Sequence, residues 1–245
     1  MKLALFGIAL LISFSSLANT PKFKICFERW WPYSFVNKEN IPKGIEVELI
    51  QLATQPNGIA VEFQELPYQR CLDSVRHGTH DFTLHVDRTD NLTLLDKSFT
   101  DWSLSLAVKQ GRFTQMSQLN TLAPRIMLAM EYPYPDEVYK RLKEMNAVII
   151  ERSFYEQSDE EAMAFFDVLE NERIDAIIVD RQWASKMIRQ YRLPVTILPE
   201  AFHNEPQFIG FREDRKEQAA LLHRLLIAIP APVKEQIHAK YLNEH

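Results

Sequence analysis

Glycine is scarce in this chain, which has 245 residues and only six glycines, one of them at position 7. Loops that cradle a phosphate and the dinucleotide fingerprint both require closely spaced glycines, because the backbone there must approach the ligand. Gly-x-Ser-x-Gly and His-Glu-x-x-His, the signatures of a nucleophile elbow and of a zinc protease helix, are absent as well. The sequence therefore offers none of these catalytic motifs.

Long hydrophobic runs and stripes of basic charge are also missing. After residue 19 no apolar stretch approaches the roughly 20 residues that span a bilayer. The lysines and arginines are scattered in a chain of net charge -5, whereas nucleic-acid binding calls for a clustered basic surface. With 46% hydrophobic and 25% charged residues, the composition is that of a globular protein. We expect neither a membrane-embedded protein nor a nucleic-acid partner.

The first 18 residues have the pattern of a secretion signal. Lys2 supplies the positive flank, residues 3–12 are apolar, and Ser16-Leu17-Ala18 is a small-residue cleavage signal. The alternative is an uncleaved anchor helix, but the apolar run is shorter than a membrane span. We expect a signal peptide over 1–18 and an exported, soluble mature chain.

Only two cysteines, Cys26 and Cys71, are present, and export places them in an oxidising compartment. A bond between them would close a loop of about 45 residues, which in the chain-entropy model contributes roughly 4 kcal/mol. We expect this disulfide; a pair of buried thiols is the alternative.

Short apolar segments alternate with amphipathic ones in both halves of the mature chain. In the first half, strands are predicted over 23–27, 59–63 and 81–86, and helices over 44–53 and 67–78. In the second half, strands are predicted over 123–131, 147–151 and 174–180, and helices over 135–145, 160–172 and 181–191. Two more helices, 215–229 and 231–242, close the chain. This alternation predicts parallel β-α-β units with helices covering the sheet.

Two segments, 102–112 and 206–211, are interpreted as crossings between the two halves. Two α/β lobes joined by two crossings predict a hinge with a cleft between the lobes. We place lobe 1 in residues 19–106 and 203–245 and lobe 2 in residues 107–202.

An aromatic cluster, ERWWPYSF over 28–35, follows the first predicted strand. In open α/β sheets ligands bind beyond the carboxyl ends of the strands, so this loop is a candidate wall of a ligand site. His77, His80 and His85 fall on a helix end, a turn and a strand, so we expect no metal site, and no cofactor.

Several segments resemble the family 3 periplasmic solute-binding proteins, which bind polar amino acids and related small solutes. The family's Gly-Phe-Asp-Val-Asp-Leu pattern is similar to GIEVEL at 44–49, its Pro-Trp-like turn to Pro67-Tyr68, and its Gly-x-x-Asp-Ala to GTHDF at 78–82. DKSFTDW at 96–102, ERIDAIIVDRQWA at 172–184 and QIHAKYL at 236–242 resemble further family segments. The resemblance spans nearly the whole mature chain. It implies an α/β fold of two lobes, the type II periplasmic binding protein fold, with two hinge crossings and a ligand cleft between the lobes.

The resemblance also implies ligand-binding residues. Trp30, with Tyr33 nearby, falls where the family places the aromatic side chain that covers the solute, and Tyr68 falls at a second wall. Asp180 matches the carboxylate that receives a ligand ammonium group; the alternative is a cap for the helix that follows. Further candidates are His85, which is alternatively a hydrogen-bonded strand residue, Arg88, Tyr132 and Tyr134.

The family's carboxylate clamp is not matched. In the family an arginine after a Thr-x-Glu step holds the α-carboxylate of the ligand, often with two hydrogen bonds. Here the segment is HVDRTDNLTLL, 85–95, and the aligned position falls at Leu92 or Thr93. Arg88 lies a turn earlier and is the candidate substitute. In the second lobe, Pro133 removes a backbone donor from the corresponding loop. We expect a changed or lost carboxylate site.

These observations lead to one main hypothesis. The chain is a periplasmic binding protein that captures a small polar, amino-acid-like solute by lobe closure, acts as a monomer, and serves an inner-membrane ABC permease or a sensor protein. One alternative is a dehydratase-like enzyme on the same fold, with Glu131 as general acid. The other is a scaffold that binds only a protein partner.

Overall fold

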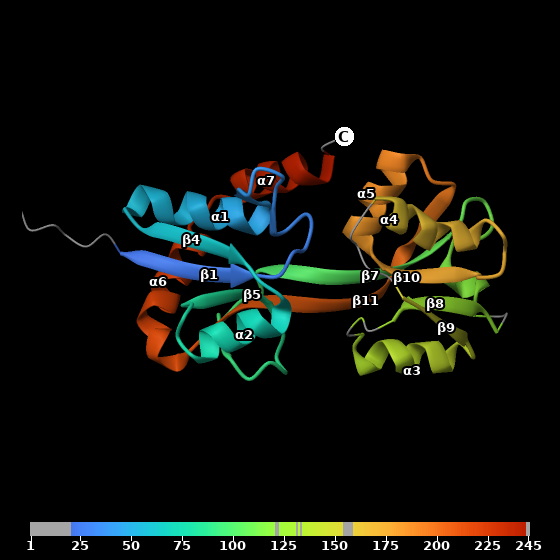
Figure 1. Cartoon of the computed structure of the whole chain (residues 1–245), viewed down its shortest axis with the longest axis horizontal. Helices are drawn as coiled ribbons and strands as arrows, with labels where there is room; N and C mark the ends of the chain where they lie inside the picture. The colour runs from blue at the N-terminus through green and yellow to red at the C-terminus, as the bar shows by residue number, and fades with distance from the viewer. Residues whose placement is uncertain (1–20, 121–122, 131, 133, 154–158, 244–245) are drawn as a thin grey trace, which may run out of the picture.

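The computed structural model describes residues 21–120, 123–130, 132, 134–153 and 159–243. Figure 1 shows two α/β lobes that lie side by side along the long axis, with two strands running from one lobe into the other. The expected signal peptide lies outside the described residues, and so does Glu131.

Lobe 1 is built on three parallel strands, β1 (Lys22–Phe27), β4 (Ala60–Glu65) and β5 (Phe82–Val86). β1 lies in the middle and pairs in parallel with both neighbours, which confirms the predicted β-α-β units. The helices of this lobe are α1 (Ile45–Thr54), α2 (Tyr68–Arg76), α6 (Lys216–Ile227) and α7 (Ala231–Asn243). The carboxyl ends of its strands point toward lobe 2 (Figure 1).

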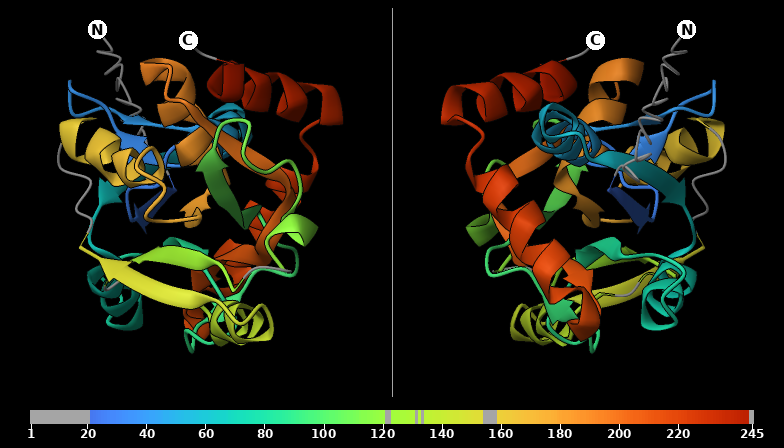
Figure 2. Two further views of the ribbon diagram at one scale, coloured as in Figure 1. Left: turned by 90° about the vertical axis from the view of Figure 1, so that its right-hand side faces the viewer. Right: turned by 90° about the vertical axis from the view of Figure 1, so that its left-hand side faces the viewer.

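Lobe 2 repeats this design with the parallel strands β8 (Arg125–Ala129), β9 (Val148–Arg152) and β10 (Ala176–Asp180). Its helices are α3 (Asp136–Glu144), α4 (Asp159–Phe166) and α5 (Arg181–Tyr191). Views along the long axis show helices on both sides of the strands (Figure 2). The parallel strands and the helices of the two lobes overlap their predicted ranges, although α4 ends at Phe166 and its predicted range continued to residue 172.

Two long antiparallel strands, β7 (Thr100–Lys109) and β11 (Val195–Phe211), connect the lobes. Their ladder runs from Thr100 opposite Gln207 to Lys109 opposite Val195. At one end β11 pairs with β5 of lobe 1, and β7 pairs with β10 of lobe 2 from Leu104 onward. The strand order of the joined sheet is β4-β1-β5-β11-β7-β10-β8-β9.

The remaining elements are short. They are the strands β2 (Phe35–Val36), β3 (Pro42–Lys43) and β6 (Thr93–Leu94) and the 3-10 turns η1 (Gln55–Asn57), η2 (Met116–Gln118), η3 (Asp167–Leu169) and η4 (Glu213–Arg215). Among the described residues, no helix has both the length and the apolar character that crossing a bilayer requires.

Each lobe has its own hydrophobic core. In lobe 1, Ile25 and Phe82 of the sheet pack with Ile50 of α1. In lobe 2, separate clusters form on the two faces of the sheet, one around Phe202 and one around Phe166. Because each lobe buries its own apolar residues, each can move as a unit.

A disulfide joins Cys26 of β1 to Cys71 of α2, as predicted from the two cysteines. Val75 of α2 is buried against it, and Leu92 packs there too. The bond links the end of β1 to the first turns of α2. It therefore restricts how far the loop after β1 can move relative to the amino terminus of α2.

Candidate functional site

Trp30 and Asp180 meet between the lobes. Trp30 lies in the loop after β1, and its indole Nε1 donates a hydrogen bond to Asp180 Oδ2 at 3.2 Å. Asp180 ends β10, and its Oδ1 accepts the backbone N–H of Trp183 at 2.8 Å, which caps α5. The carboxylate is therefore a helix cap, as the alternative interpretation held, and it also faces the aromatic loop of lobe 1.

A tight turn sets the orientation of this aromatic loop. The backbone N–H of Trp30 donates to the carbonyl of Ser34 at 2.7 Å, and that of Tyr33 donates to the carbonyl of Trp30 at 2.8 Å. The turn brings the rings of Trp30 and Tyr33 to 4.5 Å. Gly44, the residue before α1, contacts this turn: a Cβ atom there would lie 2.3 Å from the carbonyl oxygen of Tyr33, and φ is 119°. Only glycine lets the helix approach the turn this closely.

Tyr33 is buried, with 7% of its surface exposed. Burial raises the pKa of its hydroxyl above the ordinary value, and the charge of Asp180 raises it further. The side chain therefore stays neutral and keeps a proton to donate.

A buried polar group lies beneath Trp30. His85 Nε2 is 2.8 Å from Glu46 Oε2 and 3.2 Å from Ser34 Oγ. The imidazole meets the indole of Trp30 edge to face, with centroids 4.7 Å apart. His85 adopts φ 60°, a backbone conformation that is uncommon for residues other than glycine and clusters at functional sites. His85 supports Trp30 from below.

Glu28 occupies the amino terminus of α2. The backbone N–H of Tyr68 donates to its carboxylate. Burial raises the pKa of Glu28 above its ordinary value, and this effect outweighs the opposing effects of His85 and of the hydrogen bond. The Tyr68 hydroxyl donates to Asp90 Oδ2 at 2.5 Å.

The expected substitute for the arginine clamp points elsewhere. The guanidinium carbon of Arg88 lies 4.9 Å from the centre of the Phe208 ring, and the side chain is exposed. At the aligned position, Leu92 packs against the disulfide and the Thr93 hydroxyl donates to Glu213 Oε2 at 3.1 Å. No guanidinium lies at this position.

Tyr132 approaches the same region from lobe 2. Its ring lies 5.9 Å from Trp102 of β7 and 4.8 Å from Tyr134. Burial raises the pKa of its hydroxyl most, and the charges of Asp180 and Glu28 also raise it, so Tyr132 lies near carboxylates of both lobes. Tyr134 instead packs against the core of lobe 2, where its hydroxyl accepts the backbone N–H of Ala129 at 3.1 Å.

The structure thus brings together Trp30, Tyr33, Tyr132 and Asp180. Among the other candidates, Tyr68 reaches the group through Glu28, His85 lies below it, and Arg88 is turned away. Sequence reasoning missed Glu28 and Trp102. Glu28 could have been found, since it is the first residue after β1, at the carboxyl end of a parallel strand.

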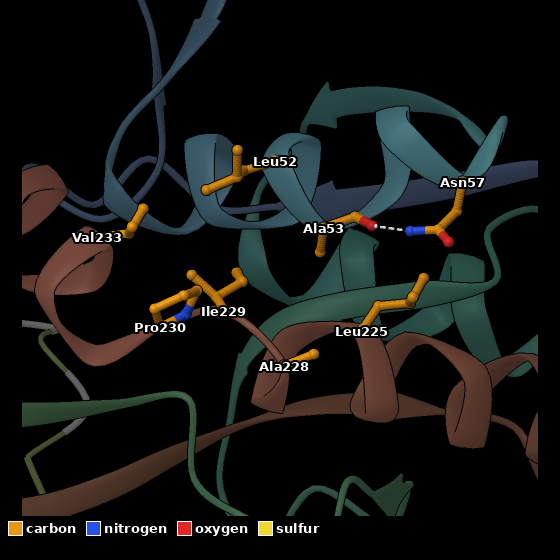
Figure 3. Close-up of a pocket in the computed structure, with 8 residues that line it drawn as sticks. All are labelled: Leu52, Ala53, Asn57, Leu225, Ala228, Ile229, Pro230 and Val233. Carbon is orange, nitrogen blue, oxygen red and sulfur yellow. Dashed lines mark hydrogen bonds between the residues drawn. The ribbon is translucent and has the colours of Figure 1, made fainter.

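Other features of the described chain do not add to this group. No three His, Cys, Asp or Glu side chains are placed to hold a metal ion among the residues that the structure describes. An apolar hollow of about 300 Å³ lies on lobe 1 alone, between α1, α6 and α7 (Figure 3). Its lining residues are Leu52, Ala53, Asn57, Leu225, Ala228, Ile229, Pro230 and Val233.

Comparison with known proteins agrees with the two-lobed architecture. The family model described as bacterial extracellular solute-binding proteins, family 3, matches residues 23–244. No curated protein sequence matches the chain.

Solved structures share its fold. The L-cystine solute receptor of Neisseria gonorrhoeae, in its unliganded open conformation, has a TM-score of 0.69 at 14% identity, over 92% of this chain and 94% of the receptor. A Salmonella typhimurium periplasmic binding protein with high arginine specificity has a TM-score of 0.64 at 14% identity, over 91% and 99%. An ancestral amino acid-binding protein, a precursor of cyclohexadienyl dehydratase, has a TM-score of 0.62 at 16% identity, over 90% and 95%. At these identities the likeness shows the fold.

Proposed function

Because this chain belongs to family 3 of the bacterial extracellular solute-binding proteins, we propose that it captures a small polar solute between its lobes and closes over it. The observation that carries the proposal is the hydrogen bond between Trp30 and Asp180, which joins an aromatic wall of lobe 1 to a carboxylate of lobe 2 at 3.2 Å. An aromatic face and a carboxylate together favour a ligand with a positively charged group.

Lobe closure is the means of capture in this proposal. A solute that touches both lobes stabilises the closed form by the difference between its affinities for the closed and the open form. Two further contacts join α5 of lobe 2 to lobe 1. The Lys186 ammonium lies 4.8 Å from the centre of the Trp31 ring, and Arg189 donates to the carbonyl of Leu242 in α7 at 2.9 Å.

The biological setting is proposed from the family and from the sequence. The signal peptide over 1–18 directs the chain to the periplasm, where the mature protein acts as a monomer. It delivers the solute to an inner-membrane ABC permease or reports it to a sensor. The fold neighbours named for L-cystine and for arginine make amino-acid-sized solutes the first class to test.

Isothermal titration against amino acids, amines and small carboxylates tests the proposal. One chemical class is expected to bind, and Asp180→Asn is expected to weaken binding about tenfold or more, because a hydrogen bond to a charged group contributes roughly 1.5–3 kcal/mol. Asparagine is as good a helix cap as aspartate, so the variant removes the charge and keeps the cap.

Glu217→Gln is the matched control, since it removes one charge from an exposed position on α6. Its affinity is expected to equal that of the wild type. If no solute of the three classes binds, the proposal fails and the protein-scaffold alternative takes its place.

Catalysis is not part of the proposal. The dehydratase-like alternative draws support from the ancestral neighbour that precedes a dehydratase. Incubation of the protein with a cyclic carboxylate separates the two functions. Turnover that disappears in Glu131→Gln would replace the binding proposal, and recovery of unchanged compound supports it.

A further inference from the structure

The chemical class of the solute can be inferred from what already fills the anion-binding donors of lobe 1; this inference rests on the function proposed above. The amino terminus of a helix is a ready site for an anion, because its N–H groups are unpaired and its dipole is positive. At α2 that place is taken by the protein itself, since the N–H of Tyr68 donates to Glu28. A carboxylate of the solute would compete with Glu28 there.

The hydrogen-bond donors of the loop after β5 are likewise paired with carboxylates of the chain itself. These donors are the N–H of Asp87, the N–H and hydroxyl of Thr89, and the nearby hydroxyl of Tyr68. Thr89 donates through both groups to Asp87 Oδ1, each at 2.6 Å. The other two donate to Asp90 Oδ2, at 2.9 Å from the Asp87 nitrogen and at 2.5 Å from the Tyr68 hydroxyl. Two carboxylates of the chain thus satisfy the donors that would otherwise receive a carboxylate of the solute.

Three basic side chains near this region have partners other than Glu28. Arg29, next to Glu28 in the chain, donates to Glu65 Oε1 at 3.0 Å and to the carbonyl of Val36 at 2.8 Å. Arg88 lies over Phe208, and Lys186 lies over Trp31. Within the described part of the chain, no lysine or arginine side chain contacts Glu28 or Trp30. The segments 121–122, 131, 133 and 154–158 contain no lysine or arginine in the sequence.

The groups that face the solute are aromatic rings and carboxylates. Tyr132 lies near Asp180 of lobe 2 and Glu28 of lobe 1, and Trp30 contacts Asp180 directly. Among the acids, Asp180 raises the pKa of the Tyr33 hydroxyl most, and Asp90 raises that of the Tyr68 hydroxyl most. Carboxylates pair with an ammonium or guanidinium group, and aromatic faces attract it.

We propose that the solute is an organic amine that carries positive charge and no carboxylate, held between Glu28 of lobe 1 and Asp180 of lobe 2 against the rings of Trp30 and Tyr132. Asp180 supplies the ammonium partner that the family resemblance implies. Glu28 is the additional acid of this chain, and at the amino terminus of α2 it supplies a second partner for positive charge.

Matched pairs of probes test this by isothermal titration: agmatine against arginine, cadaverine against lysine, and putrescine against ornithine. Each pair differs only by the carboxylate. At least one amine is expected to bind ten times or more tightly than its parent amino acid, because the carboxylate of the parent meets acids and no free donor. Glu28→Gln is expected to weaken binding of that amine about tenfold and to reduce the difference in affinity between the amine and its parent amino acid. Glu217→Gln, at an exposed position on α6, is expected to leave both affinities unchanged.

The outcomes separate this inference from the function on which it rests. If a parent amino acid binds as tightly as its amine, or if only neutral or acidic solutes bind, the inference is overturned and the solute-binding function stands. An unchanged amine affinity in folded Glu28→Gln also overturns it. If no solute binds at all, the function itself fails, and the inference fails with it.

Discussion

At the scale of single residues, Glu28 combines a cost in stability with a role in binding. Partial desolvation raises the pKa of its carboxylate, so the folded chain binds a proton at Glu28 more readily than the unfolded chain does. A group whose folded-state pKa is raised contributes stability that is fully present below its unfolded pKa and is lost as pH rises through its folded pKa. Near neutrality the ionised Glu28 therefore opposes folding.

Glu28→Gln is accordingly expected to be more stable than the wild type at pH 7 in the absence of solute, with little difference at pH 4. Glutamine retains an oxygen that can accept the N–H of Tyr68 and has no charge to desolvate. Melting temperatures of both proteins at pH 4, 5, 6 and 7 check this. A difference that stays constant with pH would contradict it, and Glu217→Gln controls for the loss of one charge. A gain in stability paired with weaker amine binding is the usual trade-off at a binding residue.

Individual site residues differ in how far the sequence predicts them. Trp30 follows β1 and Asp180 ends β10, so each lies at the carboxyl end of a parallel strand of its own lobe, where ligands bind in such sheets. The resemblance to the family nominated both residues. The position of Arg88 depends on the ring of Phe208, which is distant in sequence and reaches it only through the pairing of β11 with β5. Tertiary contacts of this kind cannot be read from local pattern.

At the scale of elements, Asp175 fixes the strands that carry Asp180 into the site. Its carboxylate accepts the backbone N–H of Arg125 at 2.7 Å and pairs with Arg112 at 2.5 Å, which ties the starts of β8 and β10 to the turn after β7. Burial alone would raise the pKa of Asp175, but the hydrogen bonds from Arg125 and the charge of Arg112 outweigh it and hold the pKa below its ordinary value.

Asp175→Asn is expected to lower the free energy of unfolding at pH 7 by about 1–3 kcal/mol, the cost of a buried hydrogen-bonding group that loses its partner. A group with a lowered folded-state pKa contributes stability that is present above its unfolded pKa and is lost as pH falls through its folded pKa. The difference from the wild type should therefore shrink at pH 3. Urea unfolding at both pH values measures it. Asp214→Asn, which breaks an exposed pair with Arg212, should change little, and an equal effect of the two variants would refute the assignment.

Most elements could be predicted from periodicity, but β11 could not be predicted in full. The sequence indicated a crossing over 206–211, whereas the strand begins at Val195. Its pairing with β7 shifts register between Ile197 and Ala201, around Pro199, so the alternation that marks a strand is interrupted there. Strands of two residues, such as β2 and β3, carry too few side chains for any period to show.

At the scale of the whole molecule, contacts outside the β7–β11 ladder also join the described parts of the two lobes. They include Trp30 with Asp180, Trp31 with Lys186, and Arg189 with the carbonyl of Leu242. The double variant Trp30→Phe, Arg189→Ala removes two hydrogen bonds and keeps a ring at position 30. Each bond contributes roughly 0.5–1.5 kcal/mol, so each loss should shift the equilibrium toward open lobes about two- to tenfold.

Small-angle X-ray scattering of the solute-free protein is expected to show a larger radius of gyration for this double variant than for the wild type. Arg173→Ala, an exposed arginine of lobe 2, serves as the control and should leave the radius unchanged. Equal radii for all three proteins would mean that these contacts do not set the lobe angle. The two lobes themselves were predicted from the alternation of elements, but the contacts between them join residues far apart in the sequence, 150 positions for Trp30 and Asp180, and needed the structure.

Because β7 and β11 are neighbours in one ladder, the joint between the halves is a hydrogen-bonded ribbon. A ribbon of this kind resists stretching and bending within its own plane more than it resists bending out of that plane. The halves therefore keep their spacing along the ribbon, and their relative motion is a bend of the paired strands that widens or narrows the gap between them. Trp102 and Glu205 are paired in this ladder. A substitution in either strand near them alters the stiffness of the connection, and with it the rate at which the lobes open and close.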